Sequence, residues 1–333
     1  MNLTIVVPTL NRSEKFANLL KYYSSNKYKG NILVIDSSNI KERKNNIILI
    51  NKFSSLKIKY IYLSKKKYRR DYLKQVQKIK TKYIVCSGDD DFFLIKSLKY
   101  LISFLDKNNS YKGACGIGLL CFKDRDEYRT YLYKNLQELN NKNGIERIKK
   151  QLSFGGYTVT HYSVIRTSIW KLIEGHKFSN SNDISGEYFY TLSLAYLARI
   201  KQFKKLIYLV RSIGHQRYKL QIPKEKEIIN LSKILNKMIK RNNNEEYENN
   251  KNLIINLLYK KLENRKNKYK FSILKMLRNL KNYVYGKKFQ NFLDFTRISK
   301  YYPLKFYLGS LINRKNRYYG FKELRLLIEF LKK

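Results

Sequence analysis

The segment YIVCSGDDDFF, residues 83–93, joins a short apolar strand to three consecutive aspartates. Three adjacent carboxylates repel one another unless positive charge lies among them. Because the chain has 25 acidic residues against 70 basic ones, such a cluster is not incidental. Carboxylates at the end of a buried strand are typical ligands of a hard divalent cation that also binds substrate phosphates. The alternative is a solvated acidic turn in which one aspartate caps the helix predicted over 95–105.

Strand and helix patterns alternate on the N-terminal side of this segment. Apolar runs predict strands at 3–7, 32–35, 47–50 and 58–63. A helix is expected after Asn11, with Asn11 as its cap and Glu14 reaching back to it. A second helix, marked by Tyr72, Val76 and Ile79, precedes the strand at 83–86. This order predicts an α/β fold with a mostly parallel sheet covered by helices on both faces.

The C-terminal side continues the α/β pattern and then becomes helical. The chain shows strand patterns at 113–122 and 206–213, helical patterns at 167–174 and 184–200, and a charged, exposed helical pattern at 123–150. Beyond Pro223, amphipathic helical patterns follow at 228–238, 253–258 and 324–331, with a polar loop expected at 242–250. We therefore expect an α/β domain at 1–222 and a basic helical region at 223–333.

Ligands of parallel α/β sheets bind beyond the carboxyl ends of the strands. Asp36 and the aspartates Asp89–Asp91 both follow such strand ends. Two acidic strand ends on one edge of the sheet indicate a nucleotide and metal site. Asp36 could instead be an ordinary turn residue or helix cap.

The formal net charge of +45 favours polyanionic partners such as nucleotide-activated substrates, anionic lipid headgroups and acidic glycans. The excess is spread along the chain, which argues against a simple nucleic-acid-binding arm, and no nucleic acid is expected as a partner. The cysteines Cys86, Cys115 and Cys121 lack paired spacing and lie in apolar surroundings, which predicts reduced thiols. No signal peptide and no membrane span is apparent, so we expect a cytoplasmic protein, with peripheral contact to the inner membrane face as an open alternative.

Three motifs, in this order and spacing, carry a resemblance to a known family. They are Val6-Val7-Pro8-Thr9-Leu10-Asn11-Arg12, Val34-Ile35-Asp36-Ser37-Ser38 and Ser87-Gly88-Asp89-Asp90-Asp91, the last a DXD-type motif. With them, roughly the N-terminal two-thirds of the chain resembles the family 2 group of bacterial inverting glycosyltransferases of GT-A fold. The resemblance implies transfer of a sugar from a nucleotide-sugar donor to a hydroxyl of a glycan, lipid-linked or protein acceptor, with Mn²⁺ or Mg²⁺ as cofactor.

The same resemblance implies roles for individual residues. Those implied in nucleotide-sugar binding are Pro8, Thr9, Asn11, Arg12, Asp36, Arg70, Asp89 and Asp90. Asp91 is the implied metal ligand, with Asp89 and His215 beside it. Glu187 is the implied catalytic base and Asp183 the second candidate. Glu187 could instead complement a helix dipole, and His215 could be a structural side chain.

Two other classes of protein remain open. Alternating tyrosine and lysine residues would suit a nucleic-acid scaffold, although the acidic cluster would repel phosphates unless a metal is bound. A sugar nucleotidyltransferase would share the α/β sheet and acidic site, but no glycine-rich basic loop follows the first strand. The charge also predicts that the helices of residues 224–333 dock on anionic lipid.

Overall fold

The structure is a computed structural model of the 333-residue chain. It describes residues 1–64, 68–124, 127–132, 138–153, 159–175, 183–213, 225–250 and 252–260, and in the C-terminal segment residues 323, 324, 326, 327 and 330. The predicted site residue His215 lies outside this part of the chain.

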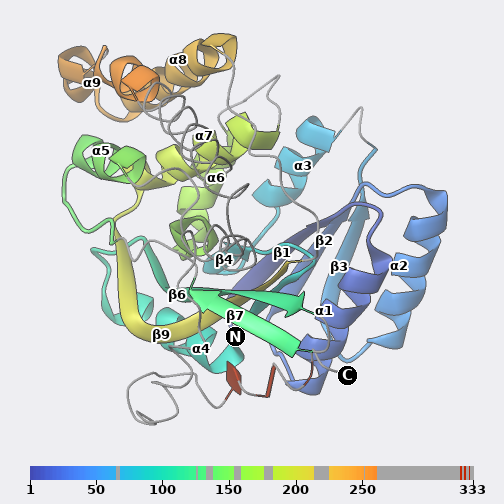
Figure 1. Ribbon diagram of the computed structural model, residues 1–333. Coiled ribbons are helices and arrows are strands. Elements are labelled where there is room, and N and C mark those ends of the chain that lie inside the picture. The colour runs from blue at the N-terminus through green and yellow to red at the C-terminus, as the bar shows by residue number, and fades with distance from the viewer. Residues whose placement is uncertain are drawn as a thin grey trace, which may run out of the picture.

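Strands and helices alternate through the first 107 residues, except that β5 directly follows β4 (Figure 1). They are β1 (Leu3–Thr9), α1 (Ser13–Ser25), β2 (Asn31–Asp36), α2 (Ile40–Lys52), β3 (Lys57–Tyr62), α3 (Tyr68–Gln77), β4 (Tyr83–Cys86), β5 (Asp91–Phe93) and α4 (Ile95–Lys107). The later elements are β6 (Gly113–Asp124), β7 (Glu127–Leu132), α5 (Gly144–Ser153), the 3-10 helix η1 (Val159–Tyr162), β8 (Val164–Arg166), α6 (Thr167–Gly175), α7 (Asp183–Leu197), β9 (Ile200–Ile213), α8 (Glu225–Asn242) and α9 (Asn244–Asn250).

The strands of the described residues form one sheet in the order β3-β2-β1-β4-β8-β6-β9-β5, with β7 paired to β6. The first four strands in this order are neighbours through parallel pairs. The second half is mixed, because β8 pairs antiparallel with β4 and β6 while β9 pairs parallel with β6 and antiparallel with β5. The α/β class is therefore confirmed, and the parallel half contains the predicted acidic strand ends.

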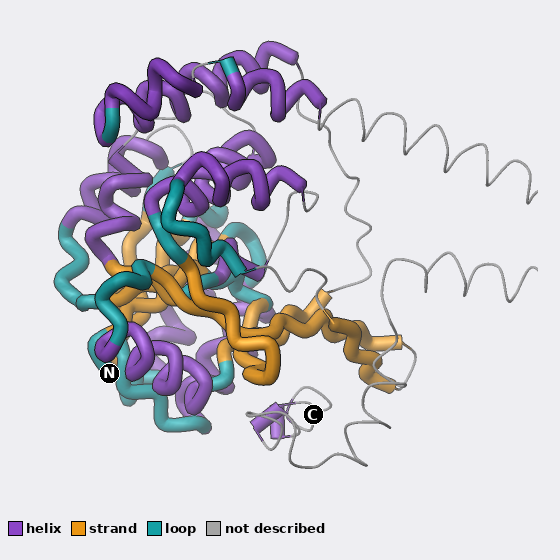
Figure 2. Tube along the Cα trace, turned by 90° about the vertical axis from the view of Figure 1, so that its left-hand side faces the viewer, coloured by secondary structure: helices purple, strands orange, loops and turns teal. Residues whose placement is uncertain are grey.

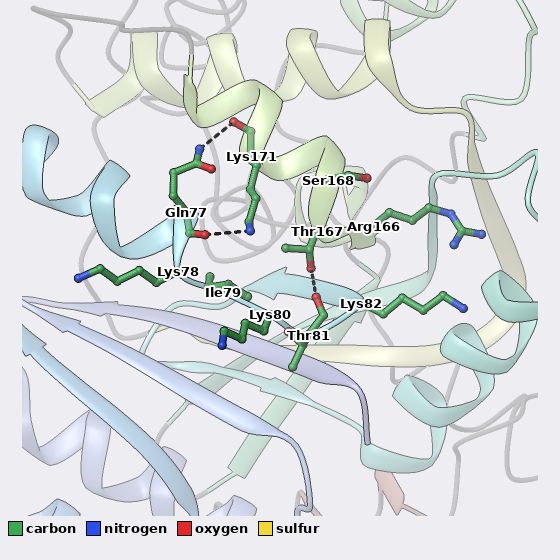
Figure 3. Close-up of a pocket in the computed structure, with 10 residues that line it drawn as sticks. All are labelled: Gln77, Lys78, Ile79, Lys80, Thr81, Lys82, Arg166, Thr167, Ser168 and Lys171. Carbon is green, nitrogen blue, oxygen red and sulfur yellow. Dashed lines mark hydrogen bonds between the residues drawn. The ribbon is translucent and has the colours of Figure 1, made fainter.

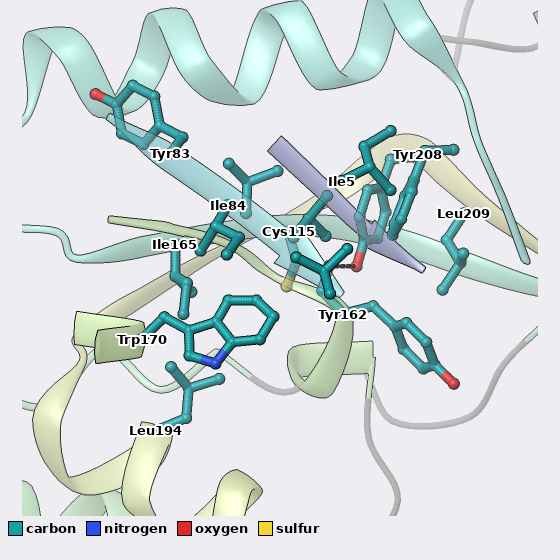
Figure 4. Close-up of a cluster of buried hydrophobic side chains, with 14 of the residues drawn as sticks. Ile5, Tyr83, Ile84, Cys115, Tyr162, Ile165, Trp170, Leu194, Tyr208 and Leu209 are labelled. Carbon is teal, nitrogen blue, oxygen red and sulfur yellow. Dashed lines mark hydrogen bonds between the residues drawn. The ribbon is translucent and has the colours of Figure 1, made fainter. Parts of the chain in front are cut away.

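Helices cover the sheet, which runs through the middle of the molecule in Figure 2. The core includes the buried α1 side chains Phe16, Leu19 and Leu20. Around β4, β6 and β8, the buried Trp170 of α6 and Leu194 of α7 contribute to the cluster shown in Figure 4. The Tyr208 hydroxyl closes this cluster by donating to the carbonyl of Tyr162 at 2.8 Å. The apolar strand runs of the sequence thus lie where both faces of the sheet are covered.

Four sequence predictions about local structure were wrong. The run 47–50 belongs to α2 and is not a strand, residues 127–132 form β7 within the predicted exposed helix, and residues 244–250 form α9 where a loop was expected. Asn11 does not cap α1: the N-cap is Arg12 without a side-chain bond, and the carboxylate of Glu42 accepts from the amide of Ser13 at 2.9 Å. The cap comes from a neighbouring helix, so no local pattern could predict it.

The helical character beyond Pro223 is confirmed for α8. Its apolar face, formed by Leu231, Leu235, Met238 and Ile239, is buried. Tyr196 of α7 donates to the carboxylate of Glu246 in α9 at 2.8 Å, which fastens this region to the α/β part. Within the described residues, none of the helices has the length and apolar character needed to cross a bilayer. The domain boundary at 222 stays a prediction.

Candidate functional site

The loops that follow the carboxyl ends of β1, β2 and β3 are tied together by backbone hydrogen bonds. Thr9 and Asp36 are partners in the parallel register of β1 and β2. The amide of Ser37 donates to the carbonyl of Thr9 at 3.1 Å, and the amide of Leu63 donates to the carbonyl of Asp36 at 2.8 Å. We call this edge, with the acidic turn at 87–91, the rim. The rim is where sheets of this kind bind ligands.

The loop after β1 folds back over the rim through a left-handed residue. Asn11 has φ 53°, a conformation that asparagine tolerates better than most residues. Its amide donates to the Ser38 hydroxyl at 2.8 Å, and its side-chain oxygen accepts from the amide of Asn39 at 2.8 Å. These bonds join the loops after β1 and β2 and place Arg12 above the acidic turn.

Asp89 is fully buried and contacts two of the predicted donor-binding residues, Thr9 and Arg12. Its carboxylate accepts from the Thr9 hydroxyl at 2.8 Å and from Arg12 Nε at 3.1 Å, and it forms an ion pair with Arg12 Nη2. Burial raises the pKa of Asp89 to about 6, although Arg12 and Thr9 act in the opposite direction. A buried carboxylate needs such partners to remain charged.

The next two aspartates are paired with other basic side chains. Asp90 accepts from Arg12 Nη1 at 3.2 Å and from Lys15 Nζ at 2.9 Å. Asp91 lies opposite Arg211 in the antiparallel pair β5–β9, and Arg211 Nε donates to its Oδ1 at 2.8 Å. Three cations therefore face three carboxylates, and these ion pairs offset the repulsion expected among three adjacent aspartates.

Asp36 is fully buried, and three donors of the chain itself occupy its carboxylate. The amide of Ser38 lies 2.7 Å from Oδ1, and Asn46 Nδ2 and the Tyr60 hydroxyl lie 2.9 and 2.7 Å from Oδ2. Burial, reinforced by the bond to Asp36, raises the pKa of the Tyr60 hydroxyl, so it stays protonated as a donor. In this arrangement Asp36 orients the loop after β2.

The remaining predicted residues are placed only by their elements. Pro8 lies half-buried in β1, and Arg70 lies in the first turn of α3, with its side chain outside the described part. Asp183 and Glu187 lie four residues apart on α7, which puts them on one face of that helix. Their side chains also lie outside the described residues.

Lys15 is a site residue that the sequence analysis missed. It follows Arg12 by three residues, one helical turn, and this spacing could have indicated a second cation on the same face of α1. The pairing of Arg211 with Asp91 had no local signal, because the two residues are 120 positions apart.

Gly88 lies between two carboxylates of the acidic turn. A Cβ atom at this glycine would lie 2.8 Å from Asp91 Oδ2 and 3.0 Å from Asp90 Oδ1, so two carboxylates flank the space beside it. Carboxylate oxygens are ligands that Mg²⁺ and Mn²⁺ accept, but here Asp91 Oδ2 also accepts from the amide of Gly88 at 2.9 Å. The described residues contain no group of three histidine, cysteine or acidic side chains placed to hold a metal. Any further ligands of a cation at this turn would have to come from a substrate or from outside the described residues.

A groove of about 580 Å³ lies at the other end of β4, between the end of α3 and the start of α6 (Figure 3). Its lining includes Lys78, Lys80 and Lys82, whose side chains point in different directions in Figure 3. Lys82 is further paired with Asp106. The groove is separate from the rim and contributes nothing to the candidate site.

The family model described as "Glycosyl transferase family 2" matches residues 4–172, which include β1, the rim and the acidic turn. The chain belongs to glycosyl transferase family 2. The sequence resemblance is thereby confirmed, and the chain is a glycosyltransferase by family. No curated protein matches the sequence.

Solved structures support the fold of this family 2 chain. The TarS fragment 1–349 of S. aureus is 15% identical, with a TM-score of 0.53 over 78% of this chain and 71% of that one. The same fragment in complex with UDP-GlcNAc is 17% identical, with a TM-score of 0.50 over 72% and 67%. Identities this low show a common GT-A fold and do not identify the substrates of this chain.

Proposed function

We propose that the chain is a metal-dependent, inverting glycosyltransferase that moves a sugar from a nucleotide-sugar donor to a hydroxyl of a glycan, lipid-linked or protein acceptor. The observation that carries this proposal is the rim, where the β1 loop, the β2 loop and the acidic turn are hydrogen-bonded into one edge. In this proposal the protein works in the cytoplasm, with peripheral contact to the inner membrane face.

The nucleotide part of the donor would lie on the β1 and β2 loops. Pro8, Thr9 and Asn11 would form the floor, and Arg12 would offer phosphate oxygens a guanidinium group that is partly exposed. Arg70 would add positive charge from α3. Asp36 would hold the β2 loop in shape for the base or ribose, because its carboxylate already binds Ser38, Asn46 and Tyr60. The complex of TarS with UDP-GlcNAc supports this class of donor.

Asp91 and Asp90 would hold Mn²⁺ or Mg²⁺ beside Gly88, with His215 as the proposed further ligand. When bound, the cation would neutralise charge on the departing nucleoside diphosphate. Asp89 binds Thr9 and Arg12 in the interior, which favours a positioning role over direct ligation. Arg211 would share Asp91 with the cation or move to the diphosphate.

A carboxylate of α7 would act as the general base. Glu187 is the preferred group and Asp183 the second candidate, and either would take the proton of the acceptor hydroxyl as its oxygen attacks the anomeric carbon in line with the leaving group. Proton transfer of this kind contributes on the order of 10²–10⁴ in rate. The position of both residues at the start of α7 supports the proposal.

The proposal is tested by screening a panel of nucleotide sugars for hydrolysis and transfer, with and without Mn²⁺. We expect one donor to be consumed faster with the cation and Asp91→Ala to abolish the reaction. Asp106→Asn, which alters a surface carboxylate at the C-terminal end of α4, is the matched control and should keep full activity. An Asp91→Ala protein with normal turnover would contradict the site.

The base is tested separately. Glu187→Gln should leave donor binding intact, measured by thermal stabilisation with the donor and Mn²⁺, and should slow transfer on the order of 10²-fold or more. Normal turnover in this variant would assign the base to Asp183 or to another group.

A further inference from the structure

The outward face of α2 carries bulky apolar side chains among its polar ones, where a surface helix is ordinarily polar throughout. Its exposed residues are Ile40, Lys41, Lys44, Ile47, Ile48, Asn51 and Lys52. At 100° per residue they occupy one continuous arc of about 140°. The exposed fractions of the three isoleucines are 67% for Ile40, 42% for Ile47 and 65% for Ile48. This arc, which we call the α2 face, holds three isoleucines, three lysines and no acid.

The inner face of α2 shows why these isoleucines lie outside. Leu49 and Ile50 pack against the core, and Asn46 is fully buried with its amide donating to Asp36. The apolar run at 47–50 therefore divides between the two sides of the helix. The only acidic residue of α2, Glu42, is held by the amide of Ser13 in α1, away from the α2 face.

The α2 face begins at the rim. Ile40 directly follows Asn39, whose amide donates to the side chain of Asn11 in the β1 loop. The neighbouring Leu10 and Tyr62, which end the β1 and β3 sides of the rim, are 45% and 42% exposed. The guanidinium of Arg43 lies 4.5 Å from the centroid of the Tyr62 ring, which connects α2 to the edge strand β3. A surface that binds α2 would therefore lie close to the candidate site.

We propose that the α2 face lies on an anionic lipid surface and holds the rim next to the acceptor. Bulky apolar side chains flanked by lysines, without acids, are typical of helices that lie in a membrane interface. The lysine side chains can extend to the headgroups while the isoleucines enter the acyl boundary. A second copy of the chain is a poorer occupant, because it would bring the lysines of two α2 faces together. The choice of a lipid-linked acceptor rests on the proposed function; the docking surface does not.

The experiment measures co-sedimentation of the full chain with vesicles of phosphatidylcholine alone and of phosphatidylcholine mixed with phosphatidylglycerol. We expect binding only to the mixed vesicles. Lys41→Glu/Lys44→Glu should lower the partition coefficient about 30-fold or more, because each lysine near an anionic surface contributes about a fivefold factor. Ile47→Ser/Ile48→Ser should lower it about tenfold or more through lost apolar burial.

Two matched controls separate this surface from others. Lys233→Glu/Lys237→Glu reverses two exposed lysines on α8, which lies far from α2 in Figure 1, and Leu172→Ser removes an exposed leucine of α6. Both should keep wild-type binding, and this result for the α8 variant would also count against the docking on lipid expected from the sequence for the helices of residues 224–333. Loss of binding in the α8 variant with normal binding in the α2 variants, or absence of binding to mixed vesicles, would overturn the proposal.

The same variants are assayed for donor hydrolysis in vesicle-free buffer. Unchanged hydrolysis together with lost vesicle binding is the expected result for the α2 variants. If no variant and no wild-type protein hydrolyses any donor, the proposed function fails while the docking surface is still decided by sedimentation. Binding that resists the α2 substitutions but is competed by an acidic protein would also overturn the proposal.

Discussion

Gly88 fixes the spacing of the acidic turn because it has no side chain. A methyl group there would press on Asp91 Oδ2 and Asp90 Oδ1, which are ends of side chains and can move aside. We therefore expect Gly88→Ala to lower transfer about 10- to 100-fold, since small displacements of reacting groups are costly, while thermal unfolding changes little. Activity assays and melting curves of the same preparation check this.

Gly113→Ala is the matched control, in which we expect stability to fall and activity to stay unchanged. Its added methyl group would lie 3.1 Å from Ile165 and 3.2 Å from Ile200 in the core, far along the sheet from the rim. Overpacking should cost about 1–3 kcal/mol of stability and leave the activity of the folded protein unchanged. Equal loss of activity in both variants would show that Gly88 has no special part in the site.

His161 predicts a pH dependence of stability. Burial, and to a lesser degree Arg211, lowers its pKa to about 4, and the ring packs against Tyr162 and Tyr190. The unfolded chain binds this proton near pH 6.5 and the folded chain does not, so stability is full above pH 6.5 and falls towards pH 4. Because His161 as a whole residue is only partly buried, we expect a loss of about 2 kcal/mol.

Urea unfolding at several pH values measures this loss. His161→Gln should flatten the fall between pH 6.5 and 4, although aspartates contribute in both proteins. If the stability of the two proteins falls equally between pH 6.5 and 4, His161 does not have the lowered pKa that its burial implies.

At the scale of elements, α4 is capped from the C-terminal end of the chain. The carboxylate of Glu323 accepts from the amides of Ile95 at 2.6 Å and Lys96 at 3.2 Å, and Phe330 packs near Tyr22 of α1. α4 directly follows β5, which carries Asp91. Glu323 therefore holds the start of the helix that follows the acidic turn and β5.

Glu323→Ala should destabilise the protein by about 1–2 kcal/mol, because two amides at a helix start lose their acceptor. Chemical denaturation measures the change, with Glu245→Ala on the exposed side of α9 as the control. A loss no larger than that of the control would show that water replaces the carboxylate without cost.

At the scale of the molecule, α8 adds buried side chains to the core of the α/β part, and α9 is joined to it by a hydrogen bond. The α8 side chains Leu231, Leu235, Met238 and Ile239 are buried, and Glu246 holds Tyr196 of α7. A chain that ends at residue 222 would expose the surface they cover. Because each buried side chain contributes about 1.5–3 kcal/mol, we expect the melting temperature to fall by about 10 °C or more. An unchanged melting temperature would establish residues 1–222 as an independent domain.

The sequence by itself determined the α/β pattern, the acidic strand ends and the family. Strands such as 3–7 and 83–86 are continuous apolar runs, and helices such as α4 bury one stripe, so both follow from local spacing. The order of parallel strands then brings residues 9, 36 and 89 to one edge without further information.

Only the tertiary structure decided how the acidic turn is neutralised and which side of α2 faces the solvent. The partners of Asp91 and Glu323 lie 120 and 228 positions away along the chain, so no local pattern contains them. The run 47–50 places apolar side chains on both sides of α2, so its spacing did not indicate a helix and the strand prediction was wrong. Packing against α1 and the bond of buried Asn46 to Asp36 set the orientation of α2. Charge pairing and helix orientation depend on which surfaces meet, and that is fixed when the chain packs.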